Sequence, residues 1–326
     1  MTEAYFENDY VYADARIRCA ELSLIDKAAM ETVIAAKDAE EATDLLLEKG
    51  YGNGEERNPD QMFSLERAKL WDLVDELVTD KDALRVFRLP ADYNNLKAAI
   101  KEASEEEEIE GIYIEESTVD PEVVRKAVRE RSYNDLPGQM SFTAREAHDV
   151  YLRTKDGQMC DILVDRACLD EMLTAGKESG DDFVDEYARL FAAAACVKTA
   201  VRAAITKKDR EFLDQALCDS EDLNIDALKT AVQNGIESVC AFLGSTDYAE
   251  AVPELRKSVT AFERWCDNHI IEEMRSQLYN SFGIGPVAAY IIAKETEMKS
   301  LRIILSAKEN GFPETVIRER VRETYV

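Results

Sequence analysis

The chain has 326 residues, of which 46% are hydrophobic and 33% charged, so it can bury a core and is expected to fold. Its formal net charge of −27 opposes nucleic-acid phosphates and anionic lipid headgroups, so we expect no nucleic acid binding and no direct lipid insertion. With only 13 glycines and 7 prolines, the composition favours helices over a turn-rich β fold, and we expect an all-α protein.

In chain order, the first clear helical pattern follows a predicted linker at residues 50–60. Its apolar face is predicted to carry five residues at helical spacing, namely Leu65, Ala68, Trp71, Leu73 and Leu77. Its capping groups are expected between residues 60 and 64. Farther on, Asp120 and Pro121 are typical of a helix start. The strand-like segment 112–114 just before them is too short to build a sheet.

The C-terminal part contains the longest predicted helix. Pro286 suits its first turn and Gly311 its C-terminal end, and a final short helix is predicted from Pro313 to Val321. The longest apolar stretch, residues 284–293, covers about ten residues, whereas a membrane span needs roughly 20. We therefore expect no membrane crossing. Other predicted linkers are residues 104–110, 134–139 and 174–180.

Two short patterns recur about every 100 residues. An apolar, acidic, arginine, apolar pattern occurs at residues 65–68, 164–167 and 262–265. An aliphatic, basic, apolar, apolar, aliphatic pattern occurs at residues 96–100, 201–205 and 301–305. Tyrosines precede them at looser spacings, at Tyr51, Tyr133 and Tyr248. We predict three diverged helical domains, at residues 1–110, 111–213 and 214–326, with chance similarity of degenerate patterns as the alternative.

The strongest catalytic candidate is the aspartate cluster Asp181, Asp182 and Asp185. Aspartates at this spacing bind magnesium and diphosphate in all-helical prenyl-transferring enzymes, because residues i and i+4 share a helix face. Such an enzyme needs a second aspartate-rich helix, which this sequence lacks. The alternative is that these acids favour a helix N-terminus after Gly180.

Other motifs also point away from catalysis. The segment from Gly283 to Ala288 loosely matches a dinucleotide-binding loop, but a predicted helix precedes it, so we interpret it as a turn between helices. His148 and His269 belong to no metal motif and are expected at the surface or half-buried. The seven cysteines are interpreted as reduced, buried thiols of a cytosolic protein. We expect no catalytic residue, metal or cofactor.

Three segments carry a more specific signal. They are residues 10–18, residues 87–97 with the run Asp92-Tyr93-Asn94-Asn95-Leu96-Lys97, and residues 282–320 with Phe282-Gly283-Ile284-Gly285-Pro286 at their start. Together they resemble the C subunit of the bacterial and archaeal V-type or A-type rotary ATPases, the equivalent of the d subunit in eukaryotic vacuolar enzymes. Ser300 departs from this pattern, where asparagine is expected. Residues 111–219 match only by length and helical pattern.

The resemblance implies a funnel-shaped protein with three similar helical domains about a pseudo-threefold axis. It implies a non-catalytic connector on the cytoplasmic face of the membrane sector. Such a connector joins the D and F subunits of the central stalk to the membrane proteolipid ring. It passes torque between ATP hydrolysis and ion movement, with protons and sodium both open.

Three basic residues occupy matching positions in the second repeated pattern, namely Lys97, Arg202 and Arg302. If they line the axis, they could contact an acidic shaft, and otherwise they are solvated or salt-bridged helix residues. Two other functions stay open from sequence. A helical-repeat scaffold would bind peptides, although such repeats usually span about 20–50 residues. Magnesium-dependent prenyl transfer would require the aspartate cluster to face a deep pocket.

Overall fold

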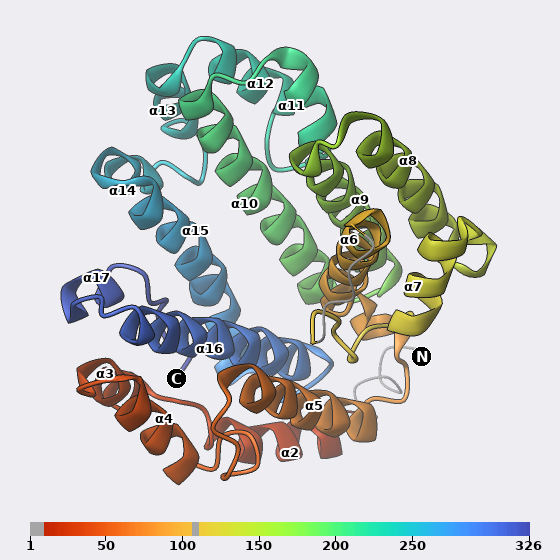
Figure 1. Cartoon of the computed structure of the whole chain (residues 1–326). Coiled ribbons are helices and arrows are strands. Elements are labelled where there is room, and N and C mark those ends of the chain that lie inside the picture. The colour runs from red at the N-terminus through yellow and green to blue at the C-terminus, as the bar shows by residue number, and fades with distance from the viewer. Residues whose placement is uncertain (1–9, 106–110) are drawn as a thin grey trace, which may run out of the picture. The chain divides into compact units, whose positions relative to one another are not determined.

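A computed structural model describes residues 10–105 and 111–326 of the chain. Within those ranges the regular elements are helices and no strand occurs, which confirms the all-α prediction. The chain divides into two compact units (Figure 1). The first, here called the terminal unit, joins Met1–Lys81 to Asp247–Val326, and the second, the central unit, is Asp82–Thr246.

The terminal unit is built from both ends of the chain. Its helices are α2 (Val11–Glu21), α3 (Lys27–Ala35), α4 (Ala39–Glu48), α5 (Pro59–Leu77), α14 (Ala251–Lys257), α15 (Val259–Met274), the 3-10 turn η3 (Arg275–Tyr279), α16 (Gly285–Glu309) and α17 (Glu314–Arg318). Helix α16 packs against α2, α4 and α5, which Figure 1 draws in red and orange beside the blue helix. The N-terminal and C-terminal segments therefore share one core.

Helix α16 is the longest element of the terminal unit, and its N-terminal part is enclosed on all sides. Its first two turns, from Gly285 to Ala293, are buried throughout, as expected of a helix enclosed by neighbours. Pro286 lies in the first turn, and Gly311 follows the helix at φ 68°, so the predicted ends are confirmed. The last helix, α17, ends at Arg318 rather than at Val321.

Helix α5 is present as predicted, but its cap and its buried face differ from the prediction. The side chain of Asn58 accepts a hydrogen bond from the Gln61 amide at 3.1 Å, so the cap precedes residues 60–64. Leu65 is 38% exposed. The buried face is shifted toward Met62, Phe63, Glu66, Leu70, Trp71 and Val74. The predicted stripe missed it because Glu66 is a charged residue in the core.

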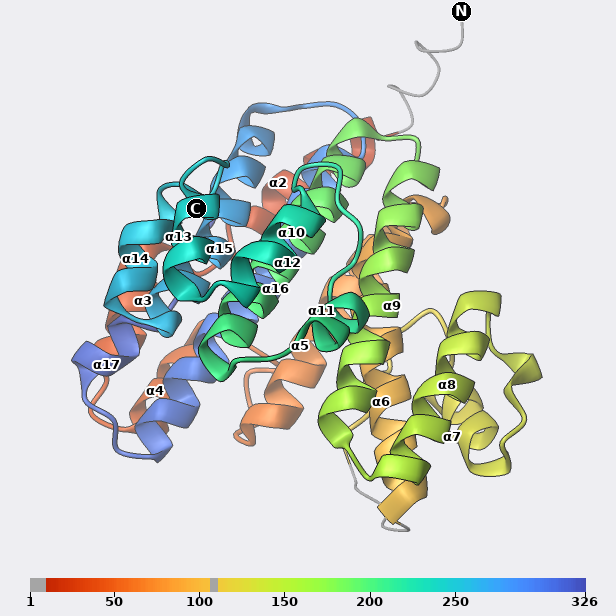
Figure 2. The same ribbon diagram turned by 90° about the horizontal axis from the view of Figure 1, so that it is seen from above.

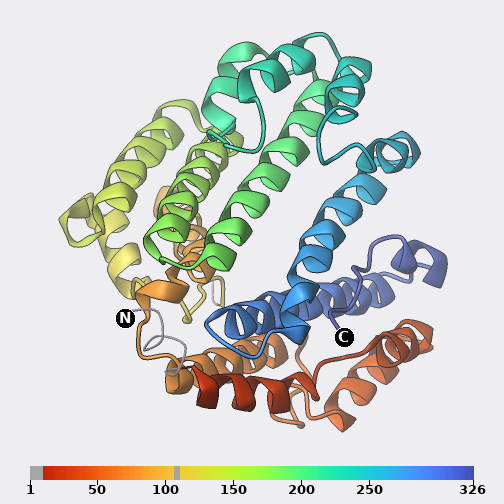
Figure 3. The ribbon, with the colours of Figure 1, turned by 180° about the vertical axis from the view of Figure 1, so that it is seen from behind.

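The central unit is one continuous stretch of chain. Its elements are η1 (Asp82–Phe87), α6 (Leu89–Glu105), α7 (Pro121–Glu130), η2 (Tyr133–Asp135), α8 (Gly138–Thr154), α9 (Gly157–Glu178), α10 (Asp182–Thr206), α11 (Arg210–Ala216), α12 (Ile225–Gln233) and α13 (Ile236–Leu243). Helices α6 and α8 lie beside α9 (Figure 2). Helix α10 runs along α9, and α12 and α13 pack on α10 (Figure 3).

The linker predicted at residues 174–180 is wrong, because α9 continues to Glu178. Gly176 is a packing residue inside this helix. A Cβ atom there would lie 2.7 Å from the Cβ of Ala188, so the glycine allows α9 and α10 to approach closely. Gly180, at φ 69°, makes the actual turn between the two helices.

The remaining predictions concern short segments, a helix start, the repeated patterns and membrane spans. Segment 112–114 forms no strand, and Asp120 caps α7 as predicted. The linker at 104–110 lies mostly outside the described residues. Each of the two repeated patterns occurs three times, and all six occurrences lie on helices, namely α5, α6, α9, α10, α15 and α16. The division into three domains stays a prediction. No helix of the described ranges is long and apolar enough to span a bilayer.

Candidate functional site

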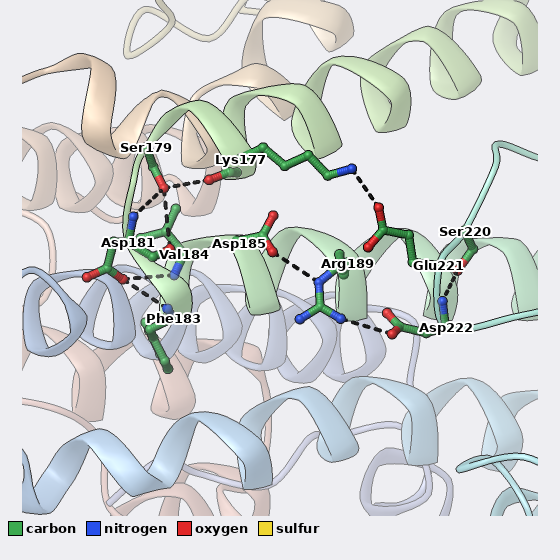
Figure 4. Close-up of polar contacts among 11 residues, drawn as sticks. Lys177, Ser179, Asp181, Phe183, Val184, Asp185, Arg189, Ser220, Glu221 and Asp222 are labelled. Carbon is green, nitrogen blue, oxygen red and sulfur yellow. Dashed lines mark hydrogen bonds and ion pairs between the residues drawn. The ribbon is translucent and has the colours of Figure 1, made fainter.

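The aspartates of residues 181–185 serve the fold of the central unit (Figure 4). The Asp181 carboxylate accepts hydrogen bonds from the Phe183 and Val184 amides at 3.0 and 3.1 Å, so Asp181 is the N-cap of α10. Asp185 accepts from Arg189 at 3.1 Å, and Asp182 is exposed. The interpretation that these acids favour a helix N-terminus is confirmed. The carboxylates of Asp181 and Asp185 contact different partners within the chain.

The same cluster ties a distant segment to α9 and α10. The Arg189 guanidinium also contacts Asp222 at 2.9 Å, and Lys177 contacts Glu221 at 2.6 Å. Figure 4 shows both basic side chains reaching the segment that begins at Ser220. Across the residues that the structure describes, no group of three or more His, Cys, Asp or Glu side chains could hold a metal ion. This arrangement therefore links helices.

The glycine motif and the histidines take structural positions. The 3-10 turn η3 and helix α15 precede Gly283 and Gly285, which confirms a turn between helices. His148 is buried, contrary to the prediction, and its Nδ1 lies 2.8 Å from the Tyr133 hydroxyl. Burial lowers the pKa of His148. His269 is half-buried as expected and stacks on Trp265 with ring centroids 4.9 Å apart.

The cysteines are free thiols, as expected. Six are buried, at residues 160, 168, 196, 218, 240 and 266, whereas Cys19 is exposed, which corrects the prediction for that residue. Helix α2 presents Cys19 outward because its buried face is formed by Ala13, Asp14, Ile17 and Glu21. Burial raises the pKa of Cys160 to about 11, as expected of an inert core thiol.

The three basic contact candidates lie on three long helices. In the central unit, the Lys97 ammonium on α6 contacts Asp165 on α9 at 2.7 Å. Arg202 is exposed on α10 and takes part in an interaction within the chain. In the terminal unit, Arg302 on α16 lies 3.7 Å from Asp60 and over the Phe63 ring at 5.1 Å. These contacts fit salt-bridged helix residues, and contact with a shaft stays a prediction.

Sequence reasoning missed a buried ionic cluster in the terminal unit. The Lys294 ammonium on α16 lies 2.7 Å from Glu66 on α5 and 2.8 Å from Glu297. The side chain of Lys294 is 5% exposed, and its ammonium also faces the Tyr51 ring at 4.6 Å. Burial by itself lowers the pKa of Lys294, but the two carboxylates outweigh it and raise this pKa. The available signal was that Lys294 and Glu297 fall at helical spacing on the apolar face of α16.

The backbone of other segments completes this cluster. The second oxygen of Glu66 accepts from the Gly52 amide at 2.9 Å, and Glu297 accepts from the Ile25 amide at 2.5 Å. Next to it, Arg67 makes a two-pronged contact with Glu295, with both N···O distances at 2.9 Å. The cluster thus fixes two loops of the N-terminal segment to the C-terminal helix.

The run Asp92 to Lys97 has a structural explanation in the central unit. The fully buried Asp92 accepts from the amides of Thr118 and Val119 at 2.8 and 2.9 Å. Asn95 brackets Ile114, accepting from its amide and donating to its carbonyl, each at 2.8 Å. One face of α6 therefore holds the loop before α7 through its backbone.

The N-terminal run at residues 10–18 likewise anchors the terminal unit. Arg18 on α2 pairs with Glu21 at 2.7 Å and donates to the carbonyl of Gln277 at 2.6 Å and to that of Asn280. These carbonyls belong to η3 and the turn before α16. Helix α2 also packs against α16, so the N-terminal and C-terminal segments that carry the resemblance contact one another.

Comparison with known proteins agrees with these observations. A family model for the ATP synthase (C/AC39) subunit matches residues 13–320. The C subunit of the V-type sodium ATPase of Enterococcus hirae is 24% identical over 97% of this chain and 99% of its own length. The C subunit of the A-type ATP synthase of Methanocaldococcus jannaschii is 25% identical over 94% of this chain and 85% of its own.

A third relative, the C subunit of the V-type ATP synthase of Thermus thermophilus, is 22% identical over 96% of this chain and 98% of its own length. The matched family is neither a helical-repeat scaffold nor a prenyl-transferring enzyme. Since the family match covers all but the outermost residues, the chain belongs to the ATP synthase (C/AC39) subunit family.

Proposed function

We propose that this chain is the non-catalytic connector of a V-type or A-type rotary ATPase. The observation that carries the proposal is the match along nearly the whole length to relatives named as the C subunit of such enzymes. A chain that matches one subunit from end to end is expected to do that subunit's work. Its place is then the cytoplasmic face of the membrane sector.

The proposed partners are the D and F subunits of the central stalk on one side and the membrane proteolipid ring on the other. A connector between them transmits torque only if it resists twisting, and close-packed helices supply that stiffness. The ion pairs between α5 and α16 support the proposal, since they hold both chain ends of the terminal unit in one core. We also propose the three similar domains about a pseudo-threefold axis.

The acidic surface fits partners that are proteins rather than lipid or nucleic acid. Within it, Lys97, Arg202 and Arg302 are the candidates for contact with the stalk. Lys97 and Arg302 already face Asp165 and Asp60. Binding would exchange these exposed carboxylates for those of the shaft, so the contact should weaken as salt rises.

Reconstitution with and without this chain tests the function. Without it, we expect the soluble head to hydrolyse ATP while ATP-driven ion uptake into vesicles is lost, and adding the chain should restore uptake. The isolated chain should show no ATPase activity. Uptake that continues undiminished without the chain, or ATP hydrolysis by the chain alone, would refute the proposal.

Charge reversal tests the contact residues. The triple variant Lys97→Glu, Arg202→Glu and Arg302→Glu should bind the stalk proteins at least about tenfold more weakly at low salt, since like charges then face each other. Lys126→Glu on α7, also exposed, is the matched control and should bind normally. Equal binding by the triple variant and the control would remove these residues from the stalk interface while leaving the connector role open.

A further inference from the structure

Two cysteines of the central unit lie in direct contact inside its core. Cys196 is in the middle of α10, and Cys218 follows the end of α11. Their Sγ atoms are 3.2 Å apart, and the Cys196 thiol also lies 3.7 Å from the Cys218 carbonyl oxygen. Each residue is at most 1% exposed, so the pair is enclosed by protein.

Two ion pairs hold the Cys218 segment in place. Four residues after Cys218, Asp222 contacts Arg189 at 2.9 Å, and the neighbouring Glu221 contacts Lys177 on α9 at 2.6 Å. Figure 4 shows this tether. Arg189 and Cys196 are two helical turns apart and share one face of α10. The Cys218 segment is thus held against this face of α10 at two points, which are the Arg189–Asp222 ion pair and the contact between the two sulfurs.

The two sulfurs have different acidities. The hydrogen bond between the two thiols lowers the pKa of Cys196. The same hydrogen bond, together with burial, raises the pKa of Cys218. Cys196 is therefore the sulfur that ionises first, and a thiolate is the form that attacks peroxides.

We infer that Cys196 and Cys218 are an oxidisable thiol pair that closes to an intramolecular disulfide when a hydroperoxide reaches it. The Cys196 thiolate attacks the peroxide, so an S–O bond forms, the O–O bond breaks and hydroxide leaves. The Cys218 thiolate then attacks the sulfenic sulfur, so the S–S bond forms and a second hydroxide leaves. The two thiol protons convert both hydroxides to water, and the peroxide takes up the two electrons that the sulfurs lose.

The expected consequence is a stiffer central unit. The cross-link would bind the middle of α10 to the segment that joins α11 to α12, closing the loop from residue 196 to residue 218. A closed loop reduces the entropy of the unfolded chain, so the oxidised protein should unfold at a higher temperature. The inference concerns the chain itself and does not depend on the proposed function.

The test uses the full chain with Cys19→Ser, which removes the exposed thiol and prevents cross-linking between molecules. The folded protein is treated with hydrogen peroxide, blocked with a thiol reagent under denaturing conditions and digested without reductant. We expect the six remaining thiols to fall to four, and mass spectrometry should find residues 196 and 218 in one linked peptide. Dithiothreitol should restore six thiols.

Three variants provide the controls. In the same background, Cys196→Ser should keep all five of its thiols. Cys218→Ser should form no linked peptide and should retain a sulfenic acid at Cys196, whereas Cys160→Ala should fall from five thiols to three. Peptide mapping of the background protein needs no further substitution, so poor folding of a variant does not affect it. Six thiols after treatment, oxidation beyond the sulfenic acid at Cys196 without a linked peptide, or a linked peptide from another cysteine pair would overturn the inference.

Discussion

In the terminal unit several polar contacts join residues from the two ends of the chain, whereas in the central unit the buried Asp92 holds a loop that is close to it in the sequence. Arg67 and Glu295 are separated by 228 positions, and Ile25 and Glu297 by 272. By contrast, Asp92 and Thr118 are separated by 26 positions. The terminal unit uses paired charges to join two distant chain segments, while Asp92 of the central unit holds the loop before α7.

The difference shows what each kind of contact can specify. A buried charge is costly to leave unpaired, so the Lys294 cluster disfavours every arrangement in which the two chain segments meet out of register. A carboxylate that caps backbone amides needs only the adjacent loop. In the central unit, close packing of small residues also joins the helices, since Gly176 on α9 packs against Ala188 on α10. We therefore expect substitutions to affect the two units by different amounts.

The largest effect is expected for Lys294→Met. This change leaves Glu297 buried without a cation and Glu66 with only the half-exposed Lys69, and breaking a buried pair in this way costs about 3–5 kcal/mol. Urea unfolding should show that the free energy of unfolding falls by about 4 kcal/mol. Amide hydrogen exchange should become faster in the terminal unit. Lys69→Met is the matched control, because Lys69 contacts the same Glu66 at 3.1 Å from a half-exposed position. It should cost less than about 1 kcal/mol, and equal losses would contradict a buried-charge role.

A somewhat smaller effect is expected for Asp92→Ala in the central unit. The amides of Thr118 and Val119 lose their acceptor, and buried unpaired donors cost about 1–3 kcal/mol each, so we expect a total of about 3 kcal/mol. Hydrogen exchange should rise in residues 112–119 and leave the terminal unit unchanged. Asp120→Ala, which removes the α7 cap, should cost about 1 kcal/mol. If hydrogen exchange became equally faster in both units, the role of Asp92 in holding only the adjacent loop would be contradicted.

The third expected effect is that of Gly176→Ala. The added methyl group would lie 2.7 Å from Ala188, and overpacking of this kind costs about 1–3 kcal/mol. We expect a loss of about 2 kcal/mol by thermal unfolding, largely recovered in the double variant with Ala188→Gly. Gly138→Ala, where a Cβ meets nothing within 4 Å, should change stability by less than about 0.5 kcal/mol. Failure of the double variant to recover stability would exclude a steric cause.

Local rules placed several ends of the helices that they predicted because caps and apolar periodicity are set within a few residues. Pro286, Gly311 and Asp120 mark helix ends as predicted. The same rules failed at Gly176, because a glycine that breaks a helix and one that lets two helices approach look alike until the neighbour is known. They also misplaced the face of α5, since Glu66 is buried only by virtue of a partner on α16.

The candidate site was predicted less completely than the fold. The sequence correctly offered a helix N-terminus as the position of Asp181, because Gly180 precedes it. It could not reveal the Lys294 cluster, whose two glutamates are 231 positions apart, from residue 66 to residue 297. The sequence alone also could not bring Cys196 to Cys218, since the contact depends on how the chain returns after α11. Contacts of this kind depend on tertiary structure.

The smallest expected effect sharpens the comparison within the terminal unit, where Asp14 is a buried carboxylate without the partners that Lys294 has. Asp14 is 4% exposed, and neither carboxylate oxygen accepts a hydrogen bond among the described residues. Burial raises the pKa of Asp14 to about 6, although the nearby Arg18 lowers it in part. The folded state thus holds this proton more tightly than the unfolded state. Its stability should therefore fall as pH rises from about 4 to about 6.

Asp14→Asn cannot ionise and should escape this loss. Because Arg18 and nearby solvent screen the charge, we expect the unfolding free energy of Asp14→Asn, relative to the unsubstituted chain, to increase by only about 1 kcal/mol between about pH 4 and pH 8. Urea unfolding at several pH values measures this difference. The control is Asp60→Asn, whose side chain is 86% exposed and whose difference should stay flat. If the difference in unfolding free energy for Asp14→Asn also stayed constant with pH, the charged Asp14 carboxylate would have to contact a partner or solvent. Asp14 would then not differ from the paired charges around Lys294.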